Sequence, residues 1–223
     1  MEDKMHDYFK IQADVTSGTD LDSQLLKIDQ ILRDISADST KEEQIELFGS
    51  LRADVLFHLK RYDGALDQLR SLYDKNPILR SGYTRRIADV YLKINRQKDA
   101  ISLLETRLRE ETDVTFKLNI LNWFIINILN PSMSVTDFQT HVSQTSAEMG
   151  ITISENMDAS EAVRFLKSEL KLAEQRFIAL TRSGEYKPVE EQIRDIEIYI
   201  AQEKVVRFRK FAEQHLLHLE KSE

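Results

Sequence analysis

The chain has no cysteine, and it has only six glycines and three prolines among its 223 residues. The absence of cysteine excludes thiol nucleophiles, disulfide bonds and thiolate metal sites, although it does not identify a cellular compartment. So few glycines and prolines leave few positions where a helix must end, and little material for a glycine-rich phosphate-binding loop. We therefore expect long regular elements, no catalytic machinery and no cofactor.

Long apolar runs are also missing. The most apolar window, Phe116 to Leu129, contains three asparagines and is shorter than the roughly 20 residues that a membrane-spanning helix needs. The first residues, Met1 to Asp7, lack the apolar stretch that follows the basic start of a secretory signal. We expect a cytoplasmic protein that binds no membrane.

The residues that are abundant favour helices. Leu, Ile, Glu, Lys, Arg and Gln dominate long stretches, and no alternating strand pattern occurs. Thr40 with Glu43 and Asp158 with Glu161 have the spacing of capping boxes at helix starts, and Gly150 is placed to end a helix. Further signals are a helix stop at Asn130-Pro131 and a cap at Ser134 to Asp137. The expected helices span 3–15, 20–36, 40–59, 116–130, 134–149, 158–182 and 189–219, and residues 60–77 are expected to form a turn and a further helix.

The last expected helix is unusually long. Residues 189–219 contain no glycine and no proline, so we expect one uninterrupted helix of about 45–50 Å. It would pair with the helix that starts after Asp158. We divide the chain into an N-terminal hairpin (1–38), a repeat region (39–150) and a long C-terminal helical hairpin (158–223), with a linker at 151–157.

A segment of the chain repeats itself. Residues 53–69 align with residues 88–104 at a shift of 35 residues, and Ala, Asp, Val, Arg, Ala and Leu match in both copies. A period of this length predicts stacked helix pairs, each of which buries its apolar face against its neighbours.

Residues 44–110 resemble the tetratricopeptide repeat, a helix-turn-helix unit of 34 residues. Tyr62 and Pro77 match its turn aromatic and its terminal proline, but Gly49 stands where the family has tryptophan. Ala53 likewise replaces the usual glycine. Further matches lie at the small and aromatic positions of the two copies: Ala65, Leu69, Ala88, Tyr91, Ala100 and Leu104. The resemblance implies an all-α solenoid of antiparallel helix hairpins, whose concave groove binds another protein.

The resemblance also places candidate partner-binding residues. The first helix of each repeat would line the groove with Asp54, His58, Arg85, Arg86, Asp89 and Lys93, beside Ser50, Phe57 and Leu92. Arg85 and Arg86 could bind a carboxylate through paired N–H groups. Alternatively, they are solvated or paired within the protein. Asn119, Asn122, Asn127 and Asn130 share one face of a later helix, where they would bind a peptide backbone or form a wet face.

Charge favours an acidic partner. The net charge is −7, yet residues 60–110 carry 12 basic and 7 acidic side chains. An acidic protein with one basic stretch is better suited to an acidic peptide than to nucleic acid. We therefore expect a non-catalytic adaptor that binds a peptide or helix in the groove. The alternative is an assembly subunit that forms homo-oligomers through its long C-terminal helices.

Overall fold

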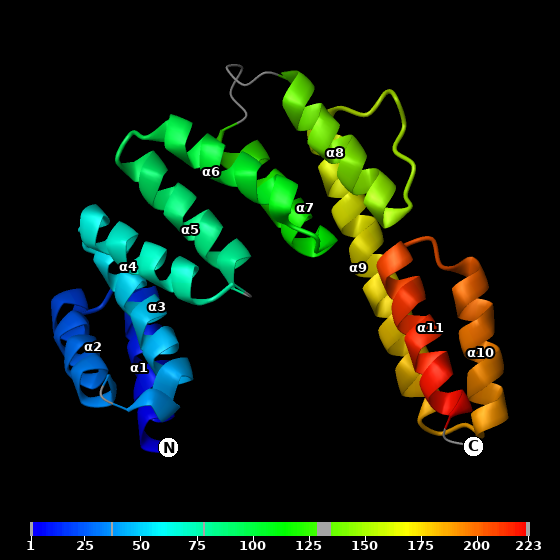
Figure 1. Cartoon of the computed structure of the whole chain (residues 1–223), viewed down its shortest axis with the longest axis horizontal. Coiled ribbons are helices and arrows are strands. Elements are labelled where there is room, and N and C mark those ends of the chain that lie inside the picture. The colour runs from blue at the N-terminus through cyan, green and yellow to red at the C-terminus, as the bar shows by residue number, and fades with distance from the viewer. Residues whose placement is uncertain (1, 37, 78, 129–134, 222–223) are drawn as a thin grey trace. The chain divides into compact units, whose positions relative to one another are not determined.

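The computed structural model describes residues 2–36, 38–77, 79–128 and 135–221, and every regular element in these segments is a helix (Figure 1). The predicted all-α class is confirmed. The chain forms two compact units, Met1–Arg109 and Glu110–Glu223. The division therefore falls inside the predicted repeat region, and the helix that begins near residue 116 belongs to the second unit. None of the described helices has both the length and the apolar character needed to cross a membrane.

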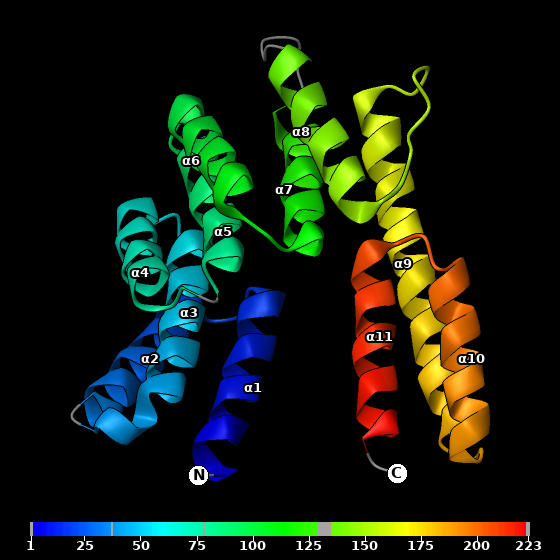
Figure 2. The ribbon, with the colours of Figure 1, turned by 45° about the vertical axis from the view of Figure 1, so that its right-hand side comes forward.

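The first unit is a series of short helices connected by tight turns. Helix α3 packs against α2 on one side and α4 on the other, α4 packs against α5, and α1 contacts both α2 and α3 (Figure 2). The elements are α1 (Glu2–Ser17), α2 (Leu21–Ile35), the 3-10 turn η1 (Ser39–Lys41), α3 (Glu42–His58), α4 (Tyr62–Lys75), α5 (Arg80–Lys93) and α6 (Gln97–Glu110).

The turn between paired helices recurs in the structure after 35 residues, as the repeat in the sequence does. Lys60 and Asn95, 35 residues apart, both have a φ of 60°. In the first turn Lys60 donates its N–H to Phe57 O and Arg61 to Leu56 O. In the second, Asn95 donates to Leu92 O and Arg96 to Tyr91 O. These bonds form a Schellman motif, which satisfies the last carbonyls of a helix.

The repeat continues in the core. Ala53 and Ala88, and likewise Ala65 and Ala100, are fully buried at equivalent positions. A methyl group is the largest side chain that such close helix crossings accept, because interiors are packed to nearly crystalline density. The predicted small residues therefore lie at helix contacts in both copies.

The predicted capping box at Thr40 and Glu43 is wrong. Asp38 is the capping residue instead: its carboxylate accepts the backbone N–H of Thr40 at 3.0 Å and the Thr40 hydroxyl at 2.6 Å. The bond from the Thr40 hydroxyl, followed by those from Lys41 and from the Thr40 backbone N–H, lowers the pKa of Asp38 to about 2. Thr40 lies inside the 3-10 turn, so α3 begins only at Glu42, with Lys41 at the N-cap position and no side-chain cap.

The second unit combines one long helix with four shorter ones: α7 (Val114–Asn127), α8 (Val135–Met149), α9 (Ala159–Gly184), α10 (Val189–Gln202) and α11 (Val206–Glu220). The predicted glycine stop after α8 is confirmed, with a φ of 74° at Gly150, and so is the capping box of Asp158 and Glu161. Asn130, Pro131 and Ser134 lie outside the described residues. Helix α7 itself ends at Asn127.

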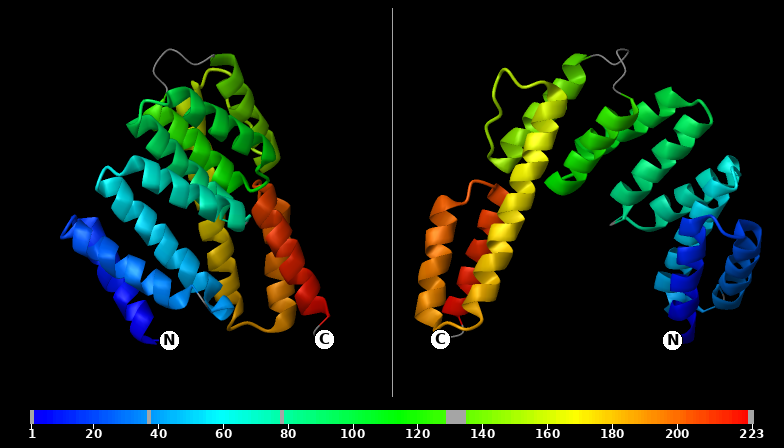
Figure 3. Two further views of the ribbon diagram at one scale, coloured as in Figure 1. Left: turned by 60° about the vertical axis from the view of Figure 1, so that its left-hand side comes forward. Right: turned by 180° about the vertical axis from the view of Figure 1, so that it is seen from behind.

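The predicted single C-terminal helix is wrong. It is divided between Gln202 and Val206, and α10 and α11 fold back against each other beside α9 (Figure 3). The cause is Glu203, whose side chain is only 1% exposed. Its carboxylate accepts two N–H groups of Arg176 at 3.0 Å each and the backbone N–H of Val205 at 2.8 Å. These bonds stabilise an extended backbone at Glu203, so the helix ends without glycine or proline.

The fold-back covers much of the apolar surface that the single helix would have left exposed. Phe177 on α9 lies about 6 Å, centroid to centroid, from Tyr199, Phe208 and Phe211. Ile196, Val205 and Phe208 are buried. Helix α9 thus packs against α7 and α8, and also against α10 and α11.

Candidate functional site

The first unit contains a pocket of about 370 Å³ between α3 and α5. It is lined by Ala53, Asp54, Phe57, His58, Leu69, Arg85, Arg86, Asp89 and Val90. Five of the predicted partner-binding residues, Asp54, His58, Arg85, Arg86 and Asp89, therefore line one pocket. Lys93 is exposed at the end of α5, one turn beyond Asp89 on the same helix face, and does not line the pocket.

The two adjacent arginines have different environments. Arg86 reaches from α5 to α3, where it donates to the Ser50 hydroxyl, to Ser50 O at 2.8 Å and to the Asp54 carboxylate. Its side chain is 21% exposed. Three acceptors on one neighbouring helix orient the guanidinium within the protein, so Arg86 joins α3 to α5 and forms part of the pocket wall.

Arg85 is exposed, and its side chain makes no hydrogen bond or ion pair with the other described side chains. The guanidinium is charged at any physiological pH and presents planar N–H groups that match a carboxylate. It therefore retains its hydrogen-bonding capacity for a group from outside the chain, whereas that of Arg86 is largely used.

Aromatic rings border the pocket at the C-terminal end of α3. The exposed His58 ring lies 6.0 Å from Phe57 in an edge-on arrangement, and Phe57 lies 5.7 Å from Tyr62. Edge-on packing at these distances is favourable and restricts the ring orientations. The pocket thus combines a free cation, an imidazole and an aromatic side.

The predicted asparagine row belongs to α7, in the second unit. Asn119 is exposed and Asn122 is half-buried, while Asn127 donates its amide to the backbone carbonyl of Trp123 at 3.0 Å. Trp123 and Phe124 on the same helix are 5% and 1% exposed, which confirms that they are core residues. The amides therefore form the polar face of an otherwise buried helix.

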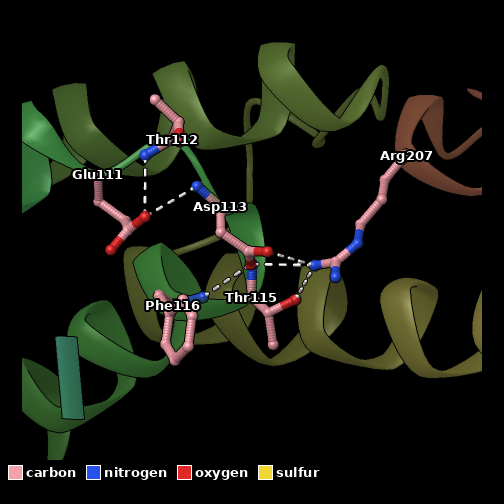
Figure 4. A network of polar contacts seen from close by, with 6 residues as sticks. All are labelled: Glu111, Thr112, Asp113, Thr115, Phe116 and Arg207. Atoms are coloured by element: carbon pink, nitrogen blue, oxygen red, sulfur yellow. Dashed lines mark hydrogen bonds and ion pairs between the residues drawn. The ribbon is translucent and has the colours of Figure 1, made fainter. Parts of the chain in front are cut away.

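The second unit contains a polar network at the start of α7 (Figure 4). Glu111 accepts the backbone N–H groups of Thr112 and Asp113 at 3.0 Å each. Asp113 caps α7 by accepting from Thr115 N and Phe116 N, and one nitrogen of Arg207 donates to both of its carboxylate oxygens and to the Thr115 hydroxyl. Each charged group drawn has a partner within the protein, so the network stabilises the unit and is not a binding site.

Sequence reasoning missed the separate roles of the two arginines. Nothing in the local sequence distinguishes Arg85 from Arg86; only the register of α5 against α3 places Arg86 opposite Ser50 and Asp54. Within the part of the chain that the structure describes, no three His, Asp or Glu side chains gather in a geometry suited to a metal ion. No protein-family model matches this sequence, and the searches of curated proteins and of solved structures found no match.

Proposed function

We propose that the chain is a cytoplasmic, non-catalytic adaptor whose hairpins α3–α4 and α5–α6 act as tetratricopeptide-like repeats. Its partner is another protein, which presents an acidic peptide or helix to the pocket between α3 and α5. The observation that carries the proposal is Arg85: an exposed guanidinium with no partner among the described residues, in a 370 Å³ pocket.

Two further pocket residues, Asp54 and His58, are compatible with an acidic ligand, although Asp89 also lines the pocket. Asp54 shares its carboxylate with Arg86, which reduces the repulsion that a second carboxylate would meet near Arg85. His58 supplies a further hydrogen-bond donor at the pocket. The excess of basic residues between positions 60 and 110 adds a favourable long-range field.

The test is an array of short acidic peptides, compared with a second array in which every Asp and Glu is replaced by Asn or Gln. We expect the protein to bind a subset of the acidic peptides and to lose the signal as ionic strength rises. Arg85→Glu should abolish this binding, because the new carboxylate on α5 would repel the carboxylate of the peptide. The matched control is Lys98→Glu, which changes the net charge equally at an exposed site on α6.

Equal binding to both arrays would contradict the proposal, as would equal losses in the two charge-reversal variants. The assembly alternative has less support than the sequence suggested. It assigned an oligomer interface to the long C-terminal helices, and α10 and α11 instead pack against each other and against α9, which leaves Ile198, Phe211 and Leu217 as exposed apolar residues.

A further inference from the structure

Gly82 makes no contact among the described residues that would require glycine. It is exposed in the first turn of α5, and a Cβ atom added there would find no other atom within 4 Å. Its φ is not in the left-handed region, so the backbone does not require glycine. Because alanine is the better helix former, the glycine carries a small cost that no contact in the protein explains.

The other glycines differ in this respect. Gly18 and Gly150 end helices with a positive φ, and a Cβ at Gly49 would lie 2.9 Å from the Gln68 side chain. Gly64 is the closest match to Gly82, because each is the third residue of its helix. A Cβ at Gly64 would meet Leu56 at an ordinary 3.5 Å, so Gly64 faces the protein where Gly82 faces open space.

Gly82 lies on the helix face that lines the pocket. It precedes Arg85 by three residues and Arg86 by four, and residues at these spacings are neighbours on a helix surface. Asp89, a further pocket residue, lies on the same face one turn later. Gly82 is not itself one of the residues that line the pocket, but its bare backbone lies on the same face of α5, one turn before the Arg85 guanidinium.

We infer that Gly82 is a specificity-determining residue of the proposed site: it lets the main chain of the bound peptide approach the α5 backbone directly. This inference rests on the proposed function. Three residues of helix rise about 4.5 Å, whereas an extended peptide advances about 3.3 Å per residue. The Asp or Glu bound by Arg85 therefore follows or precedes the peptide residue over Gly82 by one or two positions.

The experiment compares Gly82→Ala with Gly64→Ala on the acidic peptide array, together with their melting temperatures and with Arg85→Glu. Gly82→Ala should weaken the binding of every peptide that depends on Arg85 by about tenfold, which corresponds to about 1.4 kcal/mol. Its melting temperature should equal or exceed that of the wild type, since alanine is favoured in helices. Gly64→Ala should bind normally.

Each of the remaining outcomes overturns either the inference about Gly82 or the proposed function. If Arg85→Glu abolishes binding but Gly82→Ala binds normally, the inference is wrong and the proposed function stands. An equal loss in Gly64→Ala would overturn the inference, because the effect would then come from the helix start. A lower melting temperature in Gly82→Ala would also overturn it, by giving Gly82 an internal role. Failure of the wild type to bind any acidic peptide overturns both.

Discussion

The two units of this protein are stabilised in different ways. In the first, the same turn recurs after 35 residues, with the same backbone hydrogen bonds and the same buried alanines. In the second, ion pairs join helices that are distant in sequence: Lys117 with Glu148, Arg176 with Glu203, and Arg207 with Asp113. The first unit also contains ion pairs between residues that are distant in sequence, such as Arg52 with Asp29 and Arg61 with Asp22, so the recurring turn is what distinguishes it from the second unit.

The comparison shows where charge is available for binding. In the second unit the charges of the three ion pairs are used internally. In the first unit the pairing is incomplete, since Arg86 is bonded to Ser50 and Asp54 while Arg85 beside it is not. Arg85 is therefore available for a partner, while the neighbouring Arg86 is engaged within the unit.

The largest expected effect is the loss of a buried pair in the second unit. The Lys117 side chain is 7% exposed and its ammonium lies 2.6 and 2.7 Å from the Glu148 oxygens. Glu148→Ala leaves this charge buried without a partner and should lower the free energy of unfolding by about 3 kcal/mol. Urea denaturation measures the loss, and the double variant Lys117→Met/Glu148→Ala should recover most of it.

The matched control is the exposed pair of Arg61 and Asp22 in the first unit, whose side chains are 54% and 69% exposed. Asp22→Ala should cost no more than about 0.5 kcal/mol. Equal costs for the two carboxylates would remove the proposed difference between the units.

The break between α10 and α11 should be nearly as sensitive. Glu203→Ala removes the acceptor of Arg176 and of the Val205 N–H, and we expect a loss of about 2 kcal/mol in urea denaturation. Glu197→Ala, at an exposed position on α10, should have little effect. If Glu203→Ala raised both stability and helix content, α10 and α11 would have merged, and our explanation of the break would be wrong.

The repeat in the first unit predicts equal responses at equivalent positions. Ala65→Leu and Ala100→Leu each overfill a fully buried site and should cost about 2 kcal/mol. The two losses should agree within about 0.5 kcal/mol if the environments are equivalent. Ala13→Leu, at an exposed position on α1, serves as the control. Unequal losses at the two buried sites would show that the sequence repeat does not extend to packing.

Substitutions in the two repeated turns should also increase the stability of the protein. Lys60 and Asn95 adopt a left-handed conformation that glycine accepts without strain, and asparagine tolerates it better than lysine does. Lys60→Gly should raise the melting temperature and increase the free energy of unfolding by about 0.5–1 kcal/mol. Asn95→Gly should increase it by less. Lys10→Gly, within α1, should lose about 1 kcal/mol. A loss at Lys60 would argue against the assigned turn.

The smallest effect concerns pH and applies to both units. Burial raises the pKa of Tyr83 and of Tyr199 above the ordinary value of 10.0, with further contributions from Glu46 and Glu203 respectively. Because folding favours the neutral phenol, this stability is complete below about pH 10 and is lost as the pH rises further. Tyrosinate absorbance should show two tyrosines that ionise late, one removed by Tyr83→Phe and one by Tyr199→Phe. Simultaneous ionisation of all tyrosines would contradict the assignment.

The sequence predicted the first unit better than the second for a physical reason. Helices and turns depend on residues within a few positions of one another. The spacing of Ala53, Ala65, Ala88 and Ala100 was therefore sufficient to predict the paired helices and their small contact residues. The break at Glu203 depends on Arg176, 27 residues away, and no local pattern contains that information. The capping error at Thr40 has a different form: Asp38, two residues earlier, caps a 3-10 turn that precedes α3, and the spacing of Thr40 and Glu43 does not reveal that turn.

The residues of the candidate site were predictable from the sequence, but their individual roles were not. Helical spacing and the family resemblance placed five residues on the groove side of two helices, and these residues line a single pocket: Asp54, His58, Arg85, Arg86 and Asp89. They did not reveal which arginine is internally bonded, because that depends on the register between α3 and α5. The significance of Gly82 was also hidden, since it depends on an absence of neighbours.

The most direct test is to measure peptide affinity and melting temperature together for Arg85→Ala and Arg86→Ala, with an acidic peptide from the array as the probe. The account predicts that Arg85→Ala loses binding at an unchanged melting temperature. Arg86→Ala should lower the melting temperature, because its bonds to Ser50 and Asp54 join two helices. If Arg85→Ala binds like the wild type, Arg85 is not the anchor and the central claim is wrong.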